Sequence, residues 1–581
     1  MDYINIKING LDVSAPKGST ILEAARLANI DIPTLCFLKE INEIGACRMC
    51  VVEVKGARSL CAACVYPINE GMEVFTNTPK VIAARKKNLQ LLLSNHDRKC
   101  LSCVRSGNCE LQKLCKDYKI EEEGLYDGER TPSEIDYSAA HMYRDNSKCI
   151  LCRRCVAVCE KVQGVGVIGA NERGFKTFIG SAFEMDLADT SCVSCGQCIA
   201  VCPTGALSEK DNTDEVLAAI NNPEKYVVVQ TAPAVRAALG EAFGLPIGTN
   251  VEGKMIAALR RIGFDKVFDT NFAADLTIME EANEFLDRVK NGGKLPLITS
   301  CSPGWVKYCE HYFPDMTDNL SSCKSPQQMF GAITKTYFAE KMGIDPKNIV
   351  CVSVMPCTAK KFEIGRDDQN AAGVADVDIS ITTRELSRLI DRMGINFLSL
   401  PDDEKFDDPL GRSTGAAVIF GATGGVMEAA LRTAVETLTG ETLDNVDFEA
   451  VRGVQGIKEA SFDVAGMTVK VAVASGLKNA NELLTKVKNG EAEYHFIEIM
   501  GCPGGCVNGG GQPQQPASVR NFTDLRAERA KALYSIDAAN PIRKSHENPD
   551  IKKLYDEYLG APGSHKAHEL LHTTYVKRSI N

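Results

Sequence analysis

Clustered cysteines are the feature of this sequence that most constrains its fold. The chain has 24 cysteines among 581 residues, and many of them are separated by two or three residues. In a reducing cytosol such groups indicate metal ligands rather than disulfides, and nothing in the sequence supports an oxidising compartment. We therefore expect these cysteines to bind metal clusters.

Charge and hydropathy exclude several classes of function. The formal net charge is -10, which disfavours nucleic acid or an anionic membrane as a partner, because both need a basic surface. No apolar run reaches the roughly 18 residues of a transmembrane helix. The first residues, MDYINIKINGLDV, lack the basic and apolar regions of a secretory signal. We expect a cytoplasmic protein of about four domains.

Residues 1–79 predict a first module with a β-sheet and a helix. Isoleucines alternate with polar residues at its start, Asn9-Gly10 marks a hairpin turn, and Thr20 caps a helix with apolar periodicity. Four of its cysteines suit a 2Fe-2S cluster of the plant ferredoxin type in a β-grasp domain: Cys36, Cys47, Cys50 and Cys64. Cys61 competes for the fourth place, and position favours Cys64.

A second module, residues 80–140, opens with a helical stretch and ends in an acidic segment, 121–134, that we interpret as a linker or surface loop. Its pattern H-x3-C-x2-C-x5-C is formed by His96, Cys100, Cys103 and Cys109. Zinc also accepts three cysteines and one histidine. Beside the other cluster motifs, a 4Fe-4S cluster with one histidine ligand is the better prediction, and the neutral imidazole should raise its potential.

An internal repeat, C-x2-C-x2-C-x3-C, defines a third module at residues 141–212. Two-cluster ferredoxins bind each 4Fe-4S cluster with three cysteines of one run and the last cysteine of the other, and structural zinc is the alternative. Pro203 follows the last cysteine as the motif expects, whereas Glu160 stands at the equivalent place in the first run. The two predicted ligand sets are Cys149, Cys152, Cys155 and Cys202, and Cys192, Cys195, Cys198 and Cys159.

The remainder, residues 213–581, predicts an α/β domain. Short β-rich runs alternate with helical segments: YVVVQTAP, LPLITSC, NIVCVSVMPC, VDISIT, VKVAVASG and YHFIEIMGC. Three of these runs end at a cysteine. Ligands of open α/β sheets bind at the carboxyl ends of strands, so we expect these cysteines to surround a central site.

Three stretches of this domain resemble the signature sequences of iron-only (FeFe) hydrogenases: TSCSPGW (299–305), MPCTAKKFE (355–363) and MGCPGGCVNGGGQP (500–513). The resemblance extends to the tail, in RKSHEN (543–548) and AHELLHTTY (567–575). It implies a multidomain α/β enzyme that oxidises and produces H2 at an H-cluster. This cofactor is a 4Fe-4S cube joined through a cysteine sulfur to a two-iron unit with CO, cyanide and dithiolate ligands. Electrons would pass through one 2Fe-2S and three 4Fe-4S clusters.

The resemblance also assigns residues to the cofactor. Cys357, Cys502 and Cys506 would bind the cube, with Cys506 bridging to the two irons. A lysine is a compact charged donor and methionines are polarisable, which suits a donor to cyanide and packing around the irons. The residues matched to these contacts and to a further cofactor-facing loop are Lys360, Met355, Met500, Ala232 and Pro233.

Heterolytic cleavage of H2 releases a proton inside a closed domain, and that proton needs a relay to solvent. By resemblance the relay consists of Cys301, Glu281, Ser321 and Glu284. The i, i+3 spacing of the two glutamates places both on one helical face. Without the resemblance they would be interpreted as an ordinary acidic surface.

The chain departs from the family at Ser302, where the usual TSCCP stretch has a cysteine that binds the cube. Ser302 could ligate through oxygen, Cys301 could take over, or the iron could have another ligand. The TSCSP stretch resembles catalytic subunits of multimeric, NAD(P)-linked, electron-bifurcating hydrogenases. This resemblance implies a hetero-oligomer with a flavin- and NAD(P)-binding iron-sulfur subunit, a small thioredoxin-like 2Fe-2S subunit and ferredoxin.

Two other functions stay open from the sequence. One is a stand-alone, ferredoxin-dependent hydrogenase of the same architecture. The other is a non-catalytic iron-sulfur or H2-sensing protein, which the relay residues and Lys360 disfavour. No Gly-rich dinucleotide fingerprint appears in a strand-turn-helix context, so flavin and NAD(H) chemistry would belong to partners. The cysteines without a role are interpreted as small buried hydrophobes: Cys61, Cys115, Cys309, Cys323 and Cys351.

Overall fold

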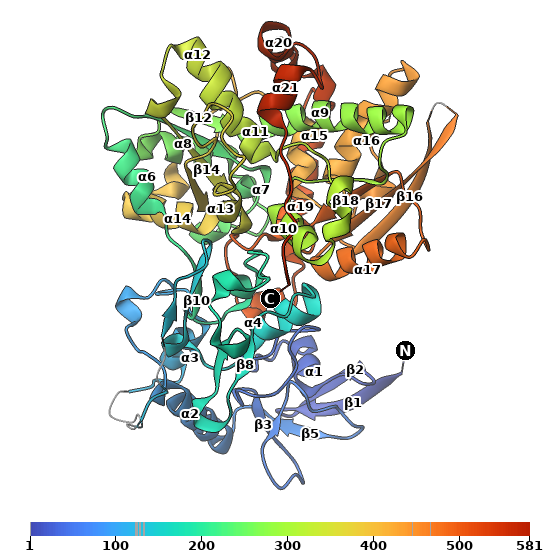
Figure 1. Cartoon of the computed structure of the whole chain (residues 1–581). Helices are drawn as coiled ribbons and strands as arrows, with labels where there is room; N and C mark the ends of the chain where they lie inside the picture. The colour runs from blue at the N-terminus through green and yellow to red at the C-terminus, as the bar shows by residue number, and fades with distance from the viewer. Residues whose placement is uncertain are drawn as a thin grey trace.

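The computed structural model describes residues 2–580, except residues 122–125, 127, 128, 132, 133, 444 and 465. Much of the acidic segment 121–134, interpreted above as a linker or loop, lies outside the described residues. In Figure 1 the large domain, coloured green to red, lies above the blue and cyan N-terminal modules, and the C-terminus lies near the boundary between them. Within the part of the chain that is described, no helix is long and apolar enough to cross a membrane.

The first module is a β-grasp fold, in which a helix packs on a mixed sheet. β1 and β2 form the predicted hairpin, whose turn residues Asn9 and Gly10 have φ angles of 51° and 83°. The predicted helix α1 (Ile21–Leu27) begins at a capping box formed by Thr20 and Glu23. β5 pairs with β1 in parallel. The strand order is β2 (Leu11–Pro16), β1 (Tyr3–Ile8), β5 (Glu73–Phe75), β3 (Val51–Val54) and β4 (Cys61–Ala62).

The next two modules consist of short elements around cysteine-bearing loops. Helices α2 (Pro79–Ser94) and α3 (Glu110–Asp117) flank the histidine-containing loop. The third module contains a sheet in the order β10-β7-β6 and two short helices. β6 (Ile135–Asp136) precedes the module and pairs with β7. The helices and strands within the module are β7 (Met142–Asp145), α4 (Arg154–Ala157), the paired strands β8 (Gly169–Asn171) and β9 (Phe178–Gly180), α5 (Gln197–Val201) and β10 (Leu207–Glu209).

The internal repeat is visible in the backbone of the third module. In each half, the residues directly before and after the second cysteine have left-handed φ angles: 53° at Leu151 and 60° at Arg153, then 60° at Ser194 and 66° at Gly196. Helices α4 and α5 begin immediately after these turns. The turns direct three successive cysteine side chains of each run toward one point, so the local spacing itself encodes the site.

Two four-stranded sheets form the core of the large domain. All strands of the first sheet are parallel: β12 (Lys266–Asp269), β11 (Tyr226–Thr231), β14 (Ile349–Met355) and β15 (Ile379–Thr382). In the second sheet three strands are parallel and the last is antiparallel: β13 (Leu297–Ile298), β18 (Phe496–Met500), β17 (Met467–Ser475) and β16 (Ile457–Val464). All six predicted β-rich runs form strands, although β13 has two residues.

Helices cover the sheets and bury the strands. The core of β11 is nearly inaccessible, with Val227, Val228 and Val229 at most 1% exposed. This burial explains why the run is continuously apolar rather than alternating. Helix α9 (Thr270–Asn291), which carries both predicted relay glutamates, packs against α11 (Pro326–Ile333) and α16 (Gly425–Thr439). Of the two predicted relay glutamates on this helix, Glu281 is therefore buried and Glu284 is partly buried.

Candidate active site and cluster sites

The carboxyl ends of three strands bring the predicted cube-binding positions together. Ser302 lies just beyond β13, Cys357 beyond β14 and Cys502 beyond β18, and Cys506 begins the helical turn that follows. Burial and the neighbouring Cys357 thiol raise the pKa of Cys506 to about 12. After burial, Cys357 is also the largest influence that raises the pKa of Cys502. These thiols are close neighbours in an apolar site, and soft sulfur donors suit an iron-sulfur cube.

The glycine-rich loop after Cys506 is pressed against two other segments. A Cβ atom at Gly509 would lie 2.1 Å from Pro356 O, and one at Gly510 would lie 2.2 Å from Cys195 O. Side chains at these positions are therefore excluded by backbone atoms of the protein itself. Glycines at these positions thus allow the loop to approach the third module closely.

Lys360 is held beside the carboxyl end of β13 by helix α13 (Ala359–Glu363). Its side chain is buried, and Nζ donates to Cys301 O at 3.2 Å and to Glu363 at 2.9 Å. Glu363 also accepts hydrogen bonds from Ser325 and Gln327, both at 2.9 Å. Our sequence analysis did not single out Glu363, although the i, i+3 spacing in MPCTAKKFE was a usable signal.

Cys301 and Ser302 have different surroundings. Ser302 Oγ accepts a hydrogen bond from Gly501 N at 3.1 Å, directly before Cys502. The pKa of Cys301 is raised well above its usual value by burial and by the carboxyl of Glu281, while Lys360 opposes this shift. Cys301 thus lies near Glu281 of α9 and near Cys506, and Ser302 contacts the backbone of the loop that carries Cys502.

The four predicted relay residues lie along one side of α9. Glu281 is 2% exposed, and burial together with the charge of Glu284 raises its pKa to about 8. Ser321 Oγ donates to Glu284 at 2.8 Å, and its contact with Glu281 partly offsets that rise. Glu284 pairs with Arg288 at 2.6 Å, one helical turn further on. The Glu284–Arg288 spacing of i, i+4 could have indicated this partner, which the sequence analysis missed.

The remaining residues matched to the cofactor line the same strand ends. Met355 and Met500 are each 2% exposed and end β14 and β18. Ala232 and Pro233 follow β11 and begin the short helix α7 (Pro233–Arg236). The predicted cofactor contacts of the large domain therefore lie at carboxyl strand ends or in the loops and short helices that follow them.

In the first module the four predicted cysteines form two close pairs. Cys50 Sγ lies 3.2 Å from Cys64 Sγ. Cys36 and Cys47 contact each other's backbone, with N to Sγ distances of 3.4 and 3.5 Å. The thiol of Cys61 instead faces Ser59 O at 3.7 Å. The geometry groups Cys64, rather than Cys61, with the other three.

In the second module His96 is buried, and its Nδ1 has no hydrogen-bond partner among the described residues. Burial lowers the pKa of this imidazole, which favours its neutral form. A buried, neutral imidazole with a free ring nitrogen fits a metal ligand. The loop that carries Cys100, Cys103 and Cys109 lies between α2 and α3, after His96.

The thiols of the third module separate into the two predicted sets. The pKa of Cys155 is raised by burial and then by Cys152, Cys202 and Cys149. The pKa of Cys198 is raised by burial and then by the other three cysteines of its set, Cys195, Cys192 and Cys159. The last cysteine of each run therefore lies with the first three cysteines of the other run, as in two-cluster ferredoxins.

The second of these sets lies directly against the large domain. Thr358 Oγ1 donates to Ser194 O at 2.8 Å, and Gln197 Nε2 donates to Asn508 O at 2.8 Å. Cys195 is close enough to Cys502 to raise the pKa of its thiol. The cysteine loop of the third module and the cube-binding loops therefore form one continuous packing unit.

Most cysteines that the sequence left without a role are buried. Cys309, Cys323 and Cys351 have no exposed surface, and Cys61 is 9% exposed. Cys115 is partly exposed, although burial still raises the pKa of its thiol to about 12. The interpretation as small buried hydrophobes is confirmed for the first three.

Family models match the chain in the order of its modules. A 2Fe-2S iron-sulfur cluster binding domain matches residues 2–79, the NADH-ubiquinone oxidoreductase-G iron-sulfur binding region matches 85–123, and a 4Fe-4S dicluster domain matches 148–206. The iron only hydrogenase large subunit, C-terminal domain, matches residues 225–510. The iron hydrogenase small subunit matches residues 523–578.

Known proteins resemble the chain over its full length. It is 54% identical to the NADP-reducing hydrogenase subunit HndD of Solidesulfovibrio fructosivorans, over 100% of both chains. It is 45% identical to iron hydrogenase 1 of Clostridium pasteurianum, over 98% of this chain and 100% of that protein. A variant of the apo FeFe-hydrogenase HydA1 from Chlamydomonas reinhardtii has a TM-score of 0.56 and 44% identity, covering 64% of this chain and 100% of that structure. Fold, site geometry and full-length identity thus agree that the chain belongs to the iron-only (FeFe) hydrogenases, the enzymes that oxidise and produce H2.

Proposed function

We propose that this chain is the hydrogen-converting subunit of a multisubunit, NADP-linked hydrogenase, in which N-terminal clusters connect the active site to a nicotinamide-binding partner. The observation that carries the proposal is the contact of the 192–198 loop with the cube-binding loops, through Thr358 and Gln197. A cluster bound by the 192–198 loop would lie directly beside the H-cluster site. Electrons could then leave the active site without a separate carrier.

The N-terminal modules would hold one 2Fe-2S and three 4Fe-4S clusters. The close Cys50–Cys64 pair supports the first of these sites, and the unpaired Nδ1 of His96 supports the second. The two thiol sets of the third module support the others. The proposed ligands are Cys36, Cys47, Cys50 and Cys64; His96, Cys100, Cys103 and Cys109; Cys149, Cys152, Cys155 and Cys202; and Cys192, Cys195, Cys198 and Cys159.

In the large domain Cys357, Cys502 and Cys506 would bind the cube of the H-cluster. Heterolytic cleavage of H2 is the chemistry that the H-cluster supplies when it is bound. Lys360 would keep a charged donor in the site, because Glu363 and Cys301 O fix its ammonium group. Two of the three donors of that ammonium are used in this way, so one is free for a ligand.

We assign Cys301 to proton transfer and not to the cube. After burial, Glu281 has the largest influence on the pKa of the Cys301 thiol, ahead of Cys506 and Lys360, and this supports the assignment. The proton would pass from Cys301 to Glu281, then through the Ser321 hydroxyl to Glu284. Glu281, with a pKa near 8, is suited both to accept and to release a proton near neutral pH. Ser302 would remain beside the cube, with its hydroxyl oxygen accepting from Gly501.

The proposed partners are a flavin- and NAD(P)-binding iron-sulfur subunit, a small thioredoxin-like 2Fe-2S subunit and ferredoxin. The relative HndD is named as a subunit of an NADP-reducing hydrogenase, and this supports a hetero-oligomer. The TSCSP stretch at Ser302 supports an electron-bifurcating complex. A cytoplasmic location fits nicotinamide chemistry and the many cysteines that form no disulfide.

The mass of the native assembly, together with assays of the isolated chain, tests this proposal. We expect the isolated, matured chain to evolve H2 from reduced viologen but not from NADPH, and the native assembly to use NADPH. Because electron transfer needs fixed cluster spacing, the interface should be permanent and large.

A stand-alone, ferredoxin-dependent hydrogenase is the second candidate. Iron hydrogenase 1, which matches 98% of this chain, is not named as a subunit. Its name favours the stand-alone hydrogenase. A native monomer with full turnover on reduced ferredoxin alone would establish this alternative and contradict the complex.

A further inference from the structure

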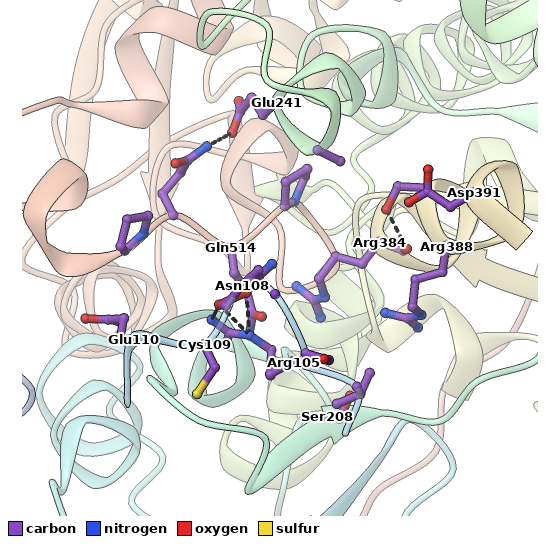
Figure 2. A pocket seen from close by; sticks show the side chains of 18 of the residues that line it. Arg105, Asn108, Cys109, Glu110, Ser208, Glu241, Arg384, Arg388, Asp391 and Gln514 are labelled. Carbon is purple, nitrogen blue, oxygen red and sulfur yellow. Dashed lines mark hydrogen bonds between the residues drawn. The ribbon is translucent and has the colours of Figure 1, made fainter. Parts of the chain in front are cut away.

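Arg105 is a buried cation in a cleft where three modules meet. The cleft, of about 550 Å³, is lined by the loop of the second module, by Glu209 of the third and by Arg384 and Arg388 of the large domain. Figure 2 shows Arg105 beside Asn108 and Cys109, with Arg384 and Arg388 opposite. The side chain of Arg105 is 7% exposed, so its charge is largely removed from water.

All hydrogen bonds of this guanidinium go to neutral oxygens. Nε donates to Asn108 Oδ1 at 2.7 Å, Nη2 donates to Asn108 O at 2.6 Å, and Nη1 donates to Cys202 O at 2.9 Å. These bonds satisfy its donors and fix its position. They do not neutralise its charge.

The carboxylates around Arg105 are already paired with other arginines. Glu110 binds Arg154 at 2.8 Å, and Glu209 binds Arg384 at 2.6 Å and Arg388 at 2.9 Å. Among the described residues, no ion pair includes Arg105. A buried charge without a counter-charge is costly, which is why buried cations are normally paired. A negative group other than a side-chain carboxylate would therefore be needed to offset the charge of Arg105.

Two of the proposed cluster sites meet at Arg105. The residue lies between Cys103 and Cys109 in the chain, and its Nη1 contacts the carbonyl of Cys202, which belongs to the other ligand set. The loops themselves are in contact, since a Cβ atom at Gly205 would lie 2.6 Å from Cys103 Sγ. Cys109 Sγ lies 3.6 Å from Pro203 O. A charge at this position is next to both sites.

We propose that Arg105 raises the reduction potentials of two clusters, the one at His96, Cys100, Cys103 and Cys109 and the one at Cys149, Cys152, Cys155 and Cys202. The inference rests on the ligands assigned under the proposed function. Reduction adds one electron to a cluster that thiolates already make negative, and a nearby unpaired cation stabilises the reduced form more than the oxidised form. Because one charge acts on both clusters, it shifts both potentials in the same direction. Arg105 acts through space and touches no substrate, so it is not a catalytic residue.

The test is a redox titration of the full-length, cluster-loaded protein, followed by electron paramagnetic resonance. In Arg105→Gln we expect both clusters to be reduced at more negative potentials, with iron content and spin counts like those of the wild type. Arg105→Lys, which keeps the charge, should retain potentials close to the wild type. Lys99→Gln removes an exposed charge beside Cys100 and should shift neither potential comparably. Unchanged potentials in a fully loaded Arg105→Gln protein, or an equal shift in Lys99→Gln, would overturn the proposal.

Asn108→Asp provides a second test that keeps the arginine in place. It puts a carboxylate where Arg105 Nε now contacts an amide oxygen at 2.7 Å, and it should lower both potentials by neutralising the guanidinium. Ser106→Asp adds the same charge to an exposed position of the same loop and is the control. If Arg105→Gln loses its clusters, a shift in Asn108→Asp no larger than that in Ser106→Asp overturns the proposal. Absence of both cluster signals in the wild type would instead contradict the ligand assignment, and this proposal with it.

Discussion

The cysteines of residues 1–212 and those of the large domain are positioned in different ways. In the third module each run places three cysteines within seven residues, and left-handed turns at Arg153 and Gly196 bring them to one point. In the large domain the predicted cube-binding positions Cys357 and Cys502 follow β14 and β18, strands of two different sheets from distant parts of the sequence. A local motif holds the first kind of site, and a tertiary fold holds the second.

This difference matches the two tasks of the protein. An electron-transfer cluster needs four ligands and an insulating shell, and a short loop can supply most of these ligands. The active site also needs a proton path and a charged donor, which come from other elements, such as α9 and α13. Substitutions in the two regions should therefore have effects of different size and kind.

The largest expected effect is that of Cys301→Ala, which removes a thiol that we assign to proton transfer and not to a cluster. We expect H2 evolution to fall by about 100-fold or more, because positioned acid–base groups contribute on this scale. The magnetic resonance signal of the cube should persist. Cys309→Ala, at a buried cysteine outside the relay, is the control and should keep most activity. Loss of the cube in Cys301→Ala would show that Cys301 is a ligand.

Glu281 provides the next test, because its pKa is raised to about 8 by burial and by Glu284. Glu281→Gln should lower turnover by about 100-fold while leaving the clusters intact. In the wild type, a protonated carboxyl band in the infrared spectrum should disappear as the pH rises through about 8. That band should be absent from Glu281→Gln.

A substitution at Glu284 tests whether the charge of Glu284 raises the pKa of Glu281. Its negative charge makes ionisation of Glu281 harder, so Glu284→Gln should move the carboxyl band of Glu281 to a lower pH. If the band titrates at the same pH in both proteins, the charge of Glu284 does not affect the pKa of Glu281.

Glu363→Gln should have an intermediate effect, which is a loss of unfolding free energy. It leaves the Lys360 ammonium buried without its carboxylate, and breaking a buried pair in this way costs about 3 kcal/mol of unfolding free energy. Glu482→Gln breaks the exposed Lys486–Glu482 pair and should cost less than about 0.5 kcal/mol. Chemical denaturation of both variants measures the difference. Equal losses would mean that Lys360 is not held by this ion pair.

The smallest effect on turnover is expected for His96→Cys, in the N-terminal region. A thiolate adds negative charge, so the cluster should remain and its potential should become more negative. H2 evolution from viologen should change by no more than a few-fold. A potential equal to that of the wild type would argue that His96 is not a ligand.

The same contrast explains what could be predicted from the sequence. The hairpin at Asn9-Gly10 and the cap at Thr20 depend on neighbours along the chain, and the structure has them as expected. The strands were also predictable from apolar runs. β13 is shorter than its run because the ladder ends at Thr299. Thr299 N still donates to Ile497 O at 3.0 Å, but Ile499 N donates to the Thr299 hydroxyl at 3.1 Å.

The partners of the active-site residues could not be derived from spacing alone. Glu363 binds Ser325, 38 positions away, and Thr358 binds Ser194, 164 positions away. Such contacts depend on how sheets and loops pack, and a single sequence carries no periodicity that indicates them. The family resemblance supplied the relay residues, and the ligand question at Ser302 was left open by the departure from that family.

One measurement tests most directly whether the two regions work as a catalytic site and its electron path. The matured full-length protein is oxidised, exposed to H2 without any mediator, and followed by electron paramagnetic resonance and iron analysis. We predict that H2 alone reduces the N-terminal clusters, and that Cys301→Ala slows this reduction by about 100-fold while the same clusters still accept electrons from dithionite. A protein with its full complement of iron and an assembled H-cluster whose N-terminal clusters stay oxidised under H2 would contradict that connection.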